Sequence, residues 1–185
     1  HLGQWGDMLH TLRDGLHMAE RNGHHLAQQL LQLAMVWLHE QAGDFAAARA
    51  LCEHVLAQAQ STHHTTGYFF SLLLLGCAHH GLGQPEHAWH CFNAILQQIE
   101  HNPDALEWIF QMPLRHALSE YWLSQAAFEP ARREAERLCN LAVQPGERTY
   151  LALGKSALAK IALAEQQWEL AEAELSQALA VLEGA

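Results

Sequence analysis

The chain has 185 residues, half of them hydrophobic, and it carries 20 acidic against 10 basic side chains, for a formal net charge of −10. A chain this apolar is not intrinsically disordered, and the excess of acidic side chains argues against nucleic acid as a partner, because phosphate contacts need clustered Lys and Arg. Ala and Leu are abundant while Val and Ile are few, so we expect helices and no substantial sheet.

No segment of the chain predicts a membrane span or a signal peptide. The longest apolar run, Phe69 to Ala78, contains Ser71 and is too short to cross a bilayer. The four cysteines form no CxxC pair and lie in apolar helical patterns: Cys52, Cys77, Cys91 and Cys139. We therefore expect reduced core cysteines in a cytoplasmic protein, with disulfides as the alternative.

Five segments of the chain align with one another without gaps, and their starts lie 40, 40, 43 and 40 residues apart. The sixth, tenth and fourteenth positions of every segment are small or apolar, a spacing that places all three on one helix face. The third position is Trp or Phe in four segments and Pro85 in the other, and an aromatic ring there can fill the helix turn. The segments start at Gly3, Gly43, Gly83, Ala126 and Gln166.

A second helix precedes four of these segments, and we expect these helices over residues 24–42, 64–82, 107–125 and 147–165. Glycines stand at three of the joints, where a helix end favours a left-handed residue: Gly23, Gly43 and Gly83. Asn102–Asp104 and Gln144–Gly146 mark two longer links. Pro113 lies inside a helical pattern, so that helix is expected to kink or to begin there.

Together these elements predict a single repeat array of about nine antiparallel helices over residues 1–185. An unpaired second helix at 3–22 is followed by helix pairs at 24–60, 64–101, 104–143 and 147–184. Each pair is too thin to bury its apolar face alone, so the pairs are expected to stack. The first and last helices each lack a neighbour, which favours a fragment of a longer protein, with self-association through the terminal helices as the alternative.

The stretch from Leu72 to Ile95 resembles the tetratricopeptide repeat (TPR) family. The Leu75–Gly76 pair, the Leu82–Gly83 turn, Ala88 and Phe92 all stand where that family has the same or similar residues, whereas Ile95 replaces its usual Ala. The resemblance extends over nearly the whole chain, although the period of ~40 residues is longer than the usual repeat. It implies an all-α, right-handed α–α superhelix.

A narrower resemblance links the stretches that begin at Gln4, Gly43 and Glu147 to the helical arrays of bacterial signalling ATPases and transcription regulators of the maltose-activator type. In those proteins the array is a sensor or a protein-docking arm, and the ATPase or DNA-binding domain lies elsewhere in the chain. This resemblance implies a non-catalytic protein–protein interaction module.

No motif in the sequence predicts catalysis or a cofactor. Gly154-Lys155-Ser156 matches the end of a phosphate-binding loop, but Thr149 stands in place of its first glycine and the region is helical. No HExxH, GxSxG or dinucleotide fingerprint occurs. We therefore expect the protein not to be an enzyme and to need no cofactor.

Histidine is unusually frequent, with 15 residues. His79, His80, His87 and His90 lie close in sequence to two cysteines, but the spacing fits no known zinc site. We expect these side chains to furnish polar surfaces, and a metal site is the alternative. Full protonation of all histidines would take the net charge from −10 towards +5, so solubility should be poor near pH 6.

The one basic cluster in the sequence is interleaved with three glutamates, and we expect pairing within the helix rather than contact with an acidic partner. The cluster consists of Arg132, Arg133 and Arg137.

In TPR proteins the first helix of each pair lines a concave groove, and the resemblance transfers this role by position. The groove candidates are Leu33, Trp37, Glu40, Phe70, Leu73, Cys77, His80, His116, Glu120, Leu123, Ser156, Lys160 and Leu163. Chaperone-binding members hold a peptide carboxylate with Lys, Arg and Asn, and Lys160 is the only basic candidate, so such a clamp is not expected. An apolar groove around Trp37, Phe70 and Leu73 would suit an amphipathic helix or an apolar loop. The alternative is that these side chains belong to the core.

The sequence thus favours a scaffold or sensing arm that binds a peptide or protein segment in this groove. The alternatives are a small-molecule sensor domain that controls a distant effector domain and, third, a metal-binding protein.

Overall fold

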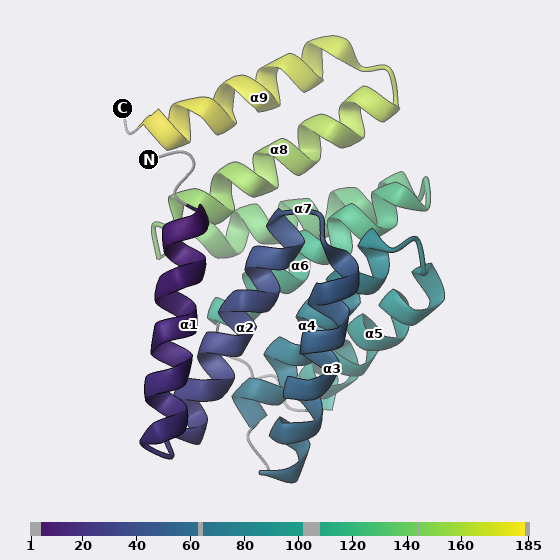
Figure 1. Cartoon of the computed structure of the whole chain (residues 1–185). Helices are drawn as coiled ribbons and strands as arrows, with labels where there is room; N and C mark the ends of the chain where they lie inside the picture. Colours follow the sequence, from purple (N-terminus) through teal and green to yellow (C-terminus); the bar gives the residue numbers. More distant parts are fainter. Residues whose placement is uncertain (1–4, 63–64, 102–107, 144, 184–185) are drawn as a thin grey trace. The chain divides into compact units, whose positions relative to one another are not determined.

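The computed structural model describes residues 5–62, 65–101, 108–143 and 145–183. In these ranges the regular structure consists of nine α-helices without a strand (Figure 1). The helices are α1 (Trp5–Arg21), α2 (His25–Gln41), α3 (Phe45–Ser61), α4 (Thr65–Gly81), α5 (Pro85–His101), α6 (Trp108–Ser124), α7 (Phe128–Val143), α8 (Arg148–Ala164) and α9 (Trp168–Glu183).

The all-α prediction is confirmed, and the predicted first helices agree with α2 and α8 to within one residue at each end and with α4 and α6 to within one residue at their C-terminal ends. The predicted starts at residues 64 and 107 lie outside the described residues. The helix containing Pro113 does not begin there, because α6 starts at Trp108 and continues through the proline. The predicted helix-pair starts at residues 3, 64 and 104, the end at residue 184 and the Asn102–Asp104 link lie outside the described residues.

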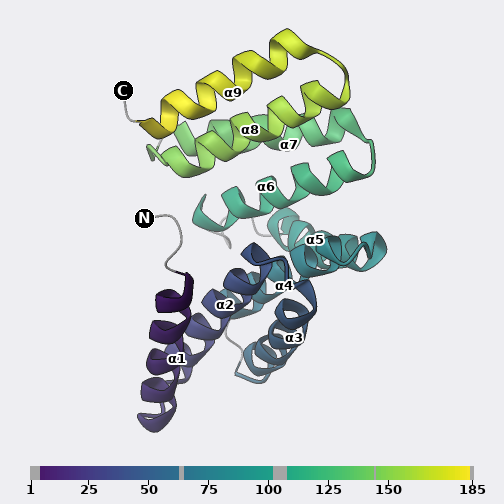
Figure 2. The same ribbon diagram turned by 45° about the horizontal axis from the view of Figure 1, so that its top comes forward.

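The chain divides into two compact units, His1–Glu100 and His101–Ala185. In the first unit α1 to α4 pack in chain order, and α2 also lies against α4. In the second unit α6 to α9 pack in chain order, and α6 also lies against α8 (Figure 2). Each unit is therefore built as a helical solenoid, in which the first helix of one pair lies beside the first helix of the next.

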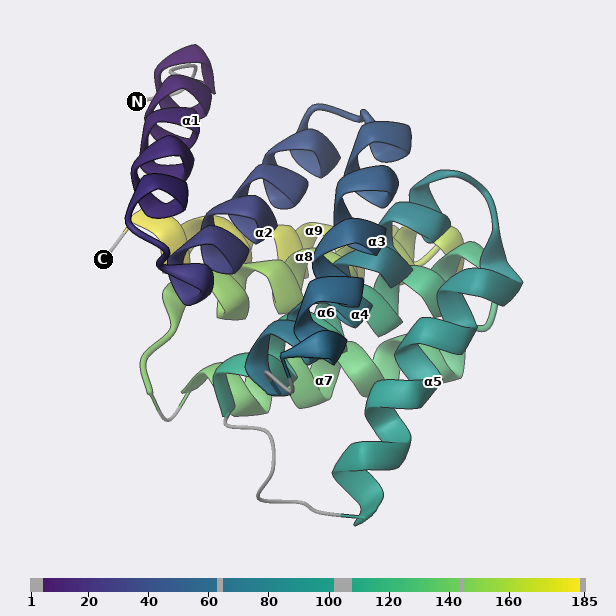
Figure 3. The same ribbon diagram turned by 60° about the horizontal axis from the view of Figure 1, so that its bottom comes forward.

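Six turns between consecutive helices share one conformation, and Figure 3 shows one of them, which joins α2 to α3. In the turn after α2, Gly43 has φ of 75°, its N–H donates to the carbonyl of Glu40, and the N–H of Asp44 donates to the carbonyl of His39. This is the Schellman arrangement, which satisfies carbonyls that the helix end leaves unpaired. The same left-handed position is filled by Gly23, Gly43, Gly83, Ala126, Gly146 and Gln166.

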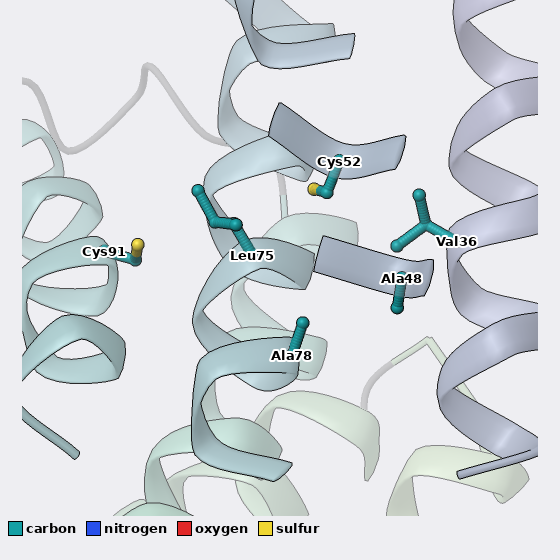
Figure 4. Packing of buried hydrophobic residues seen from close by; sticks show 6 residues of the cluster. All are labelled: Val36, Ala48, Cys52, Leu75, Ala78 and Cys91. Carbon is teal, nitrogen blue, oxygen red and sulfur yellow. The ribbon is translucent and has the colours of Figure 1, made fainter. Parts of the chain in front are cut away.

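The core of the first unit is built from small and medium side chains of α2 to α5 (Figure 4). The cluster consists of Val36, Ala48, Cys52, Leu75, Ala78 and Cys91. Two glycines of α4 allow close approach, because a Cβ on Gly76 would lie 2.5 Å from the ring of Phe92 and one on Gly81 would lie 2.4 Å from the ring of Phe45. Phe45 is a third-position aromatic, and it fills the space over the end of α4.

The second unit is held together by an alanine-rich seam and by ion pairs. Ala131 and Ala135 of α7 are buried against Ala157 and Ile161 of α8. Arg137 pairs with Glu134 within α7 at 3.0 Å, as expected for the basic cluster, but Arg132 pairs with Glu165 at the end of α8. The basic cluster therefore forms an ion pair between two helices as well as an ion pair within α7.

No helix of the described residues is both long and apolar enough to cross a membrane.

Candidate interaction surfaces

The groove residues predicted from sequence come from α2 and α4 in the first unit and from α6 and α8 in the second. Each of the two units brings together a different kind of surface. The first unit exposes apolar and aromatic side chains, and the second gathers charged ones.

In the first unit α2 presents an apolar stripe to solvent. Leu26, Leu30 and Trp37 are 53%, 47% and 42% exposed, and their spacing of four and seven residues places them on one face of the helix. Trp5 of α1 is 49% exposed and lies beside Trp37, with the ring centroids 6.2 Å apart. We call Trp5, Leu26, Leu30 and Trp37 the tryptophan patch.

The other groove candidates of this unit are less accessible. Leu33 and Leu73 are buried and contribute to packing, whereas Phe70, Cys77 and His80 of α4 are half-buried. Among the groove candidates of α2 and α4, Trp37 is thus the apolar side chain that reaches furthest into solvent. Trp5, Leu26 and Leu30 were not among the candidates, although the repeat alignment had identified Trp5 as the third-position aromatic of the first segment.

Glu40, at the C-terminal end of α2, is in an environment that disfavours its charge. Its Oε1 atom is shielded from solvent and has no hydrogen-bond partner among the described residues. Burial raises the pKa of the Glu40 carboxyl to about 8, so this side chain is largely protonated at neutral pH. A groove acid predicted from sequence is therefore a neutral hydrogen-bonding group under those conditions.

In the second unit three groove candidates form a polar cluster, which we call the α6–α8 trio: His116, Glu120 and Lys160. The ammonium of Lys160 donates to Glu120 Oε1 at 2.8 Å, and His116 Nε2 lies 4.0 Å from the same oxygen. Burial lowers the pKa of His116, with Lys160 acting in the same direction and Glu120 opposing it. His116 is therefore neutral at pH 7, and Glu120 is paired with Lys160.

The cysteines and histidines do not converge on a metal site in the described part of the chain. No group of three or more His, Cys, Asp or Glu side chains there could hold an ion. His79 stacks on His87 at 5.2 Å, and its Nδ1 is 2.7 Å from Oε1 of Gln84.

All four cysteines are free thiols. Burial raises the pKa of Cys91 to about 11, and it raises the pKa values of Cys52 and Cys77 further still. These thiols are protonated and poorly nucleophilic.

The fold is that of a helical-repeat protein, and a comparison with solved structures agrees. The chain is similar to BtubC (BKLC) from P. vanneervenii, with a TM-score of 0.71 and 15% sequence identity over 99% of this chain and 75% of that one. At this identity the likeness shows the fold alone. No model of a known protein family matches the sequence, and no curated protein matches it.

Proposed function

We propose that this chain is a TPR-type, non-catalytic interaction module that binds a peptide or protein segment through the tryptophan patch. The observation that carries the proposal is the pair of exposed tryptophan rings, Trp5 and Trp37, at the end of an apolar stripe on α2. Monomeric proteins seldom leave large aromatic side chains clustered in water, and such clusters are frequent at binding sites.

The assignment to the TPR family is supported by the residues that fill its sequence positions. Gly76 accepts the ring of Phe92 at a distance that no larger residue would allow, and Ala88 is fully buried. A scaffold or sensing arm of a bacterial signalling or transcription regulator is the setting that the sequence resemblance suggests for such a module.

The patch also defines the chemistry of the segment it would bind. Its exposed surface is apolar and aromatic, and at neutral pH the nearby Glu40 adds a neutral carboxylic acid rather than a negative charge. A segment with apolar side chains at helical spacing matches the stripe better than a strongly charged one.

The test is selection of a phage-displayed library of random 20-residue peptides on the purified chain. We expect enriched peptides whose affinity falls by about 30-fold on Trp37→Ala, because a central aromatic contact contributes about 2 kcal/mol or more. Met18→Ala is the matched control, because Met18 of α1 is 55% exposed outside the patch. Failure to enrich any peptide, or equal loss with both variants, contradicts the proposal.

A small-molecule sensor is the second candidate, and the α6–α8 trio is the observation that favours it. Lys160, Glu120 and His116 offer donors and acceptors at one place on the second unit. Native mass spectrometry of protein purified without a tag or added metal separates the candidates. A stoichiometric organic adduct that Lys160→Met abolishes would favour the sensor, a metal adduct would favour a metalloprotein, and a bare mass leaves the interaction module favoured.

A further inference from the structure

Histidine is distributed very unevenly between the two units. Thirteen of the 15 histidines lie in residues 1–100, whereas helices α6 to α9 contain one, His116. Histidine is the side chain whose charge ordinarily changes between pH 5 and pH 8. The response of these four helices to mild acid is therefore centred on a single side chain.

His116 stands at the contact between two first helices, α6 and α8. Glu120 and Lys160, which are 40 residues apart, meet there, and the Lys160 ammonium donates to Glu120 Oε1 at 2.8 Å. His116 Nε2 is 4.0 Å from the same oxygen, and the side chains of His116 and Glu120 are 30% and 26% exposed. One partly buried carboxylate oxygen thus has two basic neighbours, on two different helices.

The other ion pairs that join the helices of this unit contain no histidine among the described residues. Each of them matches one cation on one helix with one carboxylate on the next. Glu120 of its own helix and Lys160 of α8 are the charged groups that act on His116, since the charges that α7 and α9 bring to α6 and α8 are already paired. These pairs are Arg115–Glu134, Arg132–Glu165 and Lys155–Glu174.

Protonation of His116 works against the contact between α6 and α8. Burial lowers the pKa of His116 from 6.5, and Lys160 acts in the same direction while Glu120 opposes it. A histidine whose folded pKa lies below its unfolded value takes up a proton more readily in the unfolded chain, so stability falls as the pH falls below 6.5. A charged His116 also places a second cation beside Lys160, at a carboxylate that is already paired.

We propose that the α6–α8 trio is a pH-sensitive joint, in which acid places a second positive charge at Glu120, weakens its pairing with Lys160 and loosens the contact between the two first helices. Near pH 7.5 the trio is neutral overall, and it gains a positive charge as the pH falls towards 5. The inference does not depend on the tryptophan patch, whose residues belong to the other unit, or on a bound ligand.

The first test is an NMR titration of the His116 ring in the full chain, followed through the Hε1–Cε1 signal that His116→Gln removes. We expect the midpoint to lie below the ordinary value of about 6.5, to rise in Lys160→Met and to fall further in Glu120→Gln. If neither variant moves the midpoint, the charges of Lys160 and Glu120 do not act on His116 and the proposal is overturned.

The second test is hydrogen exchange of the full chain at pH 7.5 and pH 5.5, with each variant compared with the parent at the same pH. The protection of α6 and α8 in the parent, divided by that in His116→Gln, should fall about two- to fivefold between the two pH values, the magnitude of one partly exposed ion pair. Using the ratio removes any loss of packing that the substitution causes at both pH values.

Two further variants complete this test. Lys160→Met, at a position whose side chain is 49% exposed, should reduce the loss of protection in acid. His90→Gln is the matched control, because it removes an exposed histidine of α5 in the first unit, and it should leave the loss in α6 and α8 unchanged. The proposal is overturned if the His116→Gln ratio does not change with pH, or if His90→Gln changes the acid response of α6 and α8 equally.

Discussion

Glu40 illustrates how the charge state of a side chain depends on its surroundings as well as on its position in a repeat. Its position on the first helix of a pair predicts a groove acid, but its burial and its shielded Oε1 atom depend on how α3 and α4 pack around the end of α2. Sequence position indicates the face of a helix that a residue occupies, whereas the depth of the surrounding side chains decides whether its charge survives.

We predict that Glu40→Gln weakens the pH dependence of stability. The folded pKa of about 8 lies above the unfolded value of 4.5, so below pH 4.5 the carboxyl is protonated in both states. As the pH rises towards 8, only the unfolded state releases the proton, and stability falls. Urea unfolding at pH 5.5, 7 and 8.5 should show a shallower decline in the variant and a gain of about 1 kcal/mol or more at pH 8.5.

Glu100→Gln is the matched control, since it removes the same charge from an exposed position of α5. The prediction is wrong if the two variants change the pH dependence equally.

At the scale of elements, the turns between helices are the most uniform feature of the chain. Glycine occupies the left-handed position in four of the six turns, and Ala126 and Gln166 adopt φ of 55° and 62° at the other two. A left-handed conformation costs a residue with a Cβ about 1–2 kcal/mol, and glycine avoids that cost.

We therefore predict that Ala126→Gly stabilises the chain by up to about 1 kcal/mol, because relief of the backbone strain exceeds the extra entropy of the unfolded chain. Ala127→Gly is the control, because it makes the same chemical change one residue later, where φ is not positive; it should destabilise by about 0.5–1 kcal/mol. Chemical denaturation measures both, and equal signs would contradict the explanation.

These turns also show which parts of the fold were predictable. The boundaries of the first helices followed from apolar periodicity and from turn residues at the joints, and α2 and α8 agree with the predicted ranges to within one residue. Ala126 and Gln166 carry no local signal of a left-handed turn, so only the repeat alignment relates them to Gly43 and Gly83. The exposure of Trp37 and the burial of Leu33 could not be separated from sequence, because both lie on the same helix and the difference depends on what α1 and α4 place beside them.

For the whole molecule, histidine protonation sets the net charge, and the net charge determines how strongly copies repel one another. The 15 histidines can carry the formal net charge from −10 to positive values as they protonate, whereas the exposed apolar side chains of the tryptophan patch and of α9 do not titrate.

We predict a solubility minimum at about pH 6, where repulsion between copies is weakest. Precipitation by polyethylene glycol from pH 5 to 8 measures it. Leu179→Gln keeps the same titratable groups but removes apolar surface, so it should raise the solubility without moving the minimum. A solubility that changes steadily across this range would contradict the prediction.

The uniform turns have a consequence for how such a chain can change in length. Gly43 and Gly83 have the same conformation and the same pair of carbonyl partners one period apart. Loss of the 40 residues from Gly43 to Leu82 would join Ala42 directly to Gly83, and the new joint would already hold a residue suited to it. Unequal recombination between repeats therefore meets no conformational barrier at these joints, and longer or shorter descendants can arise in whole helix pairs.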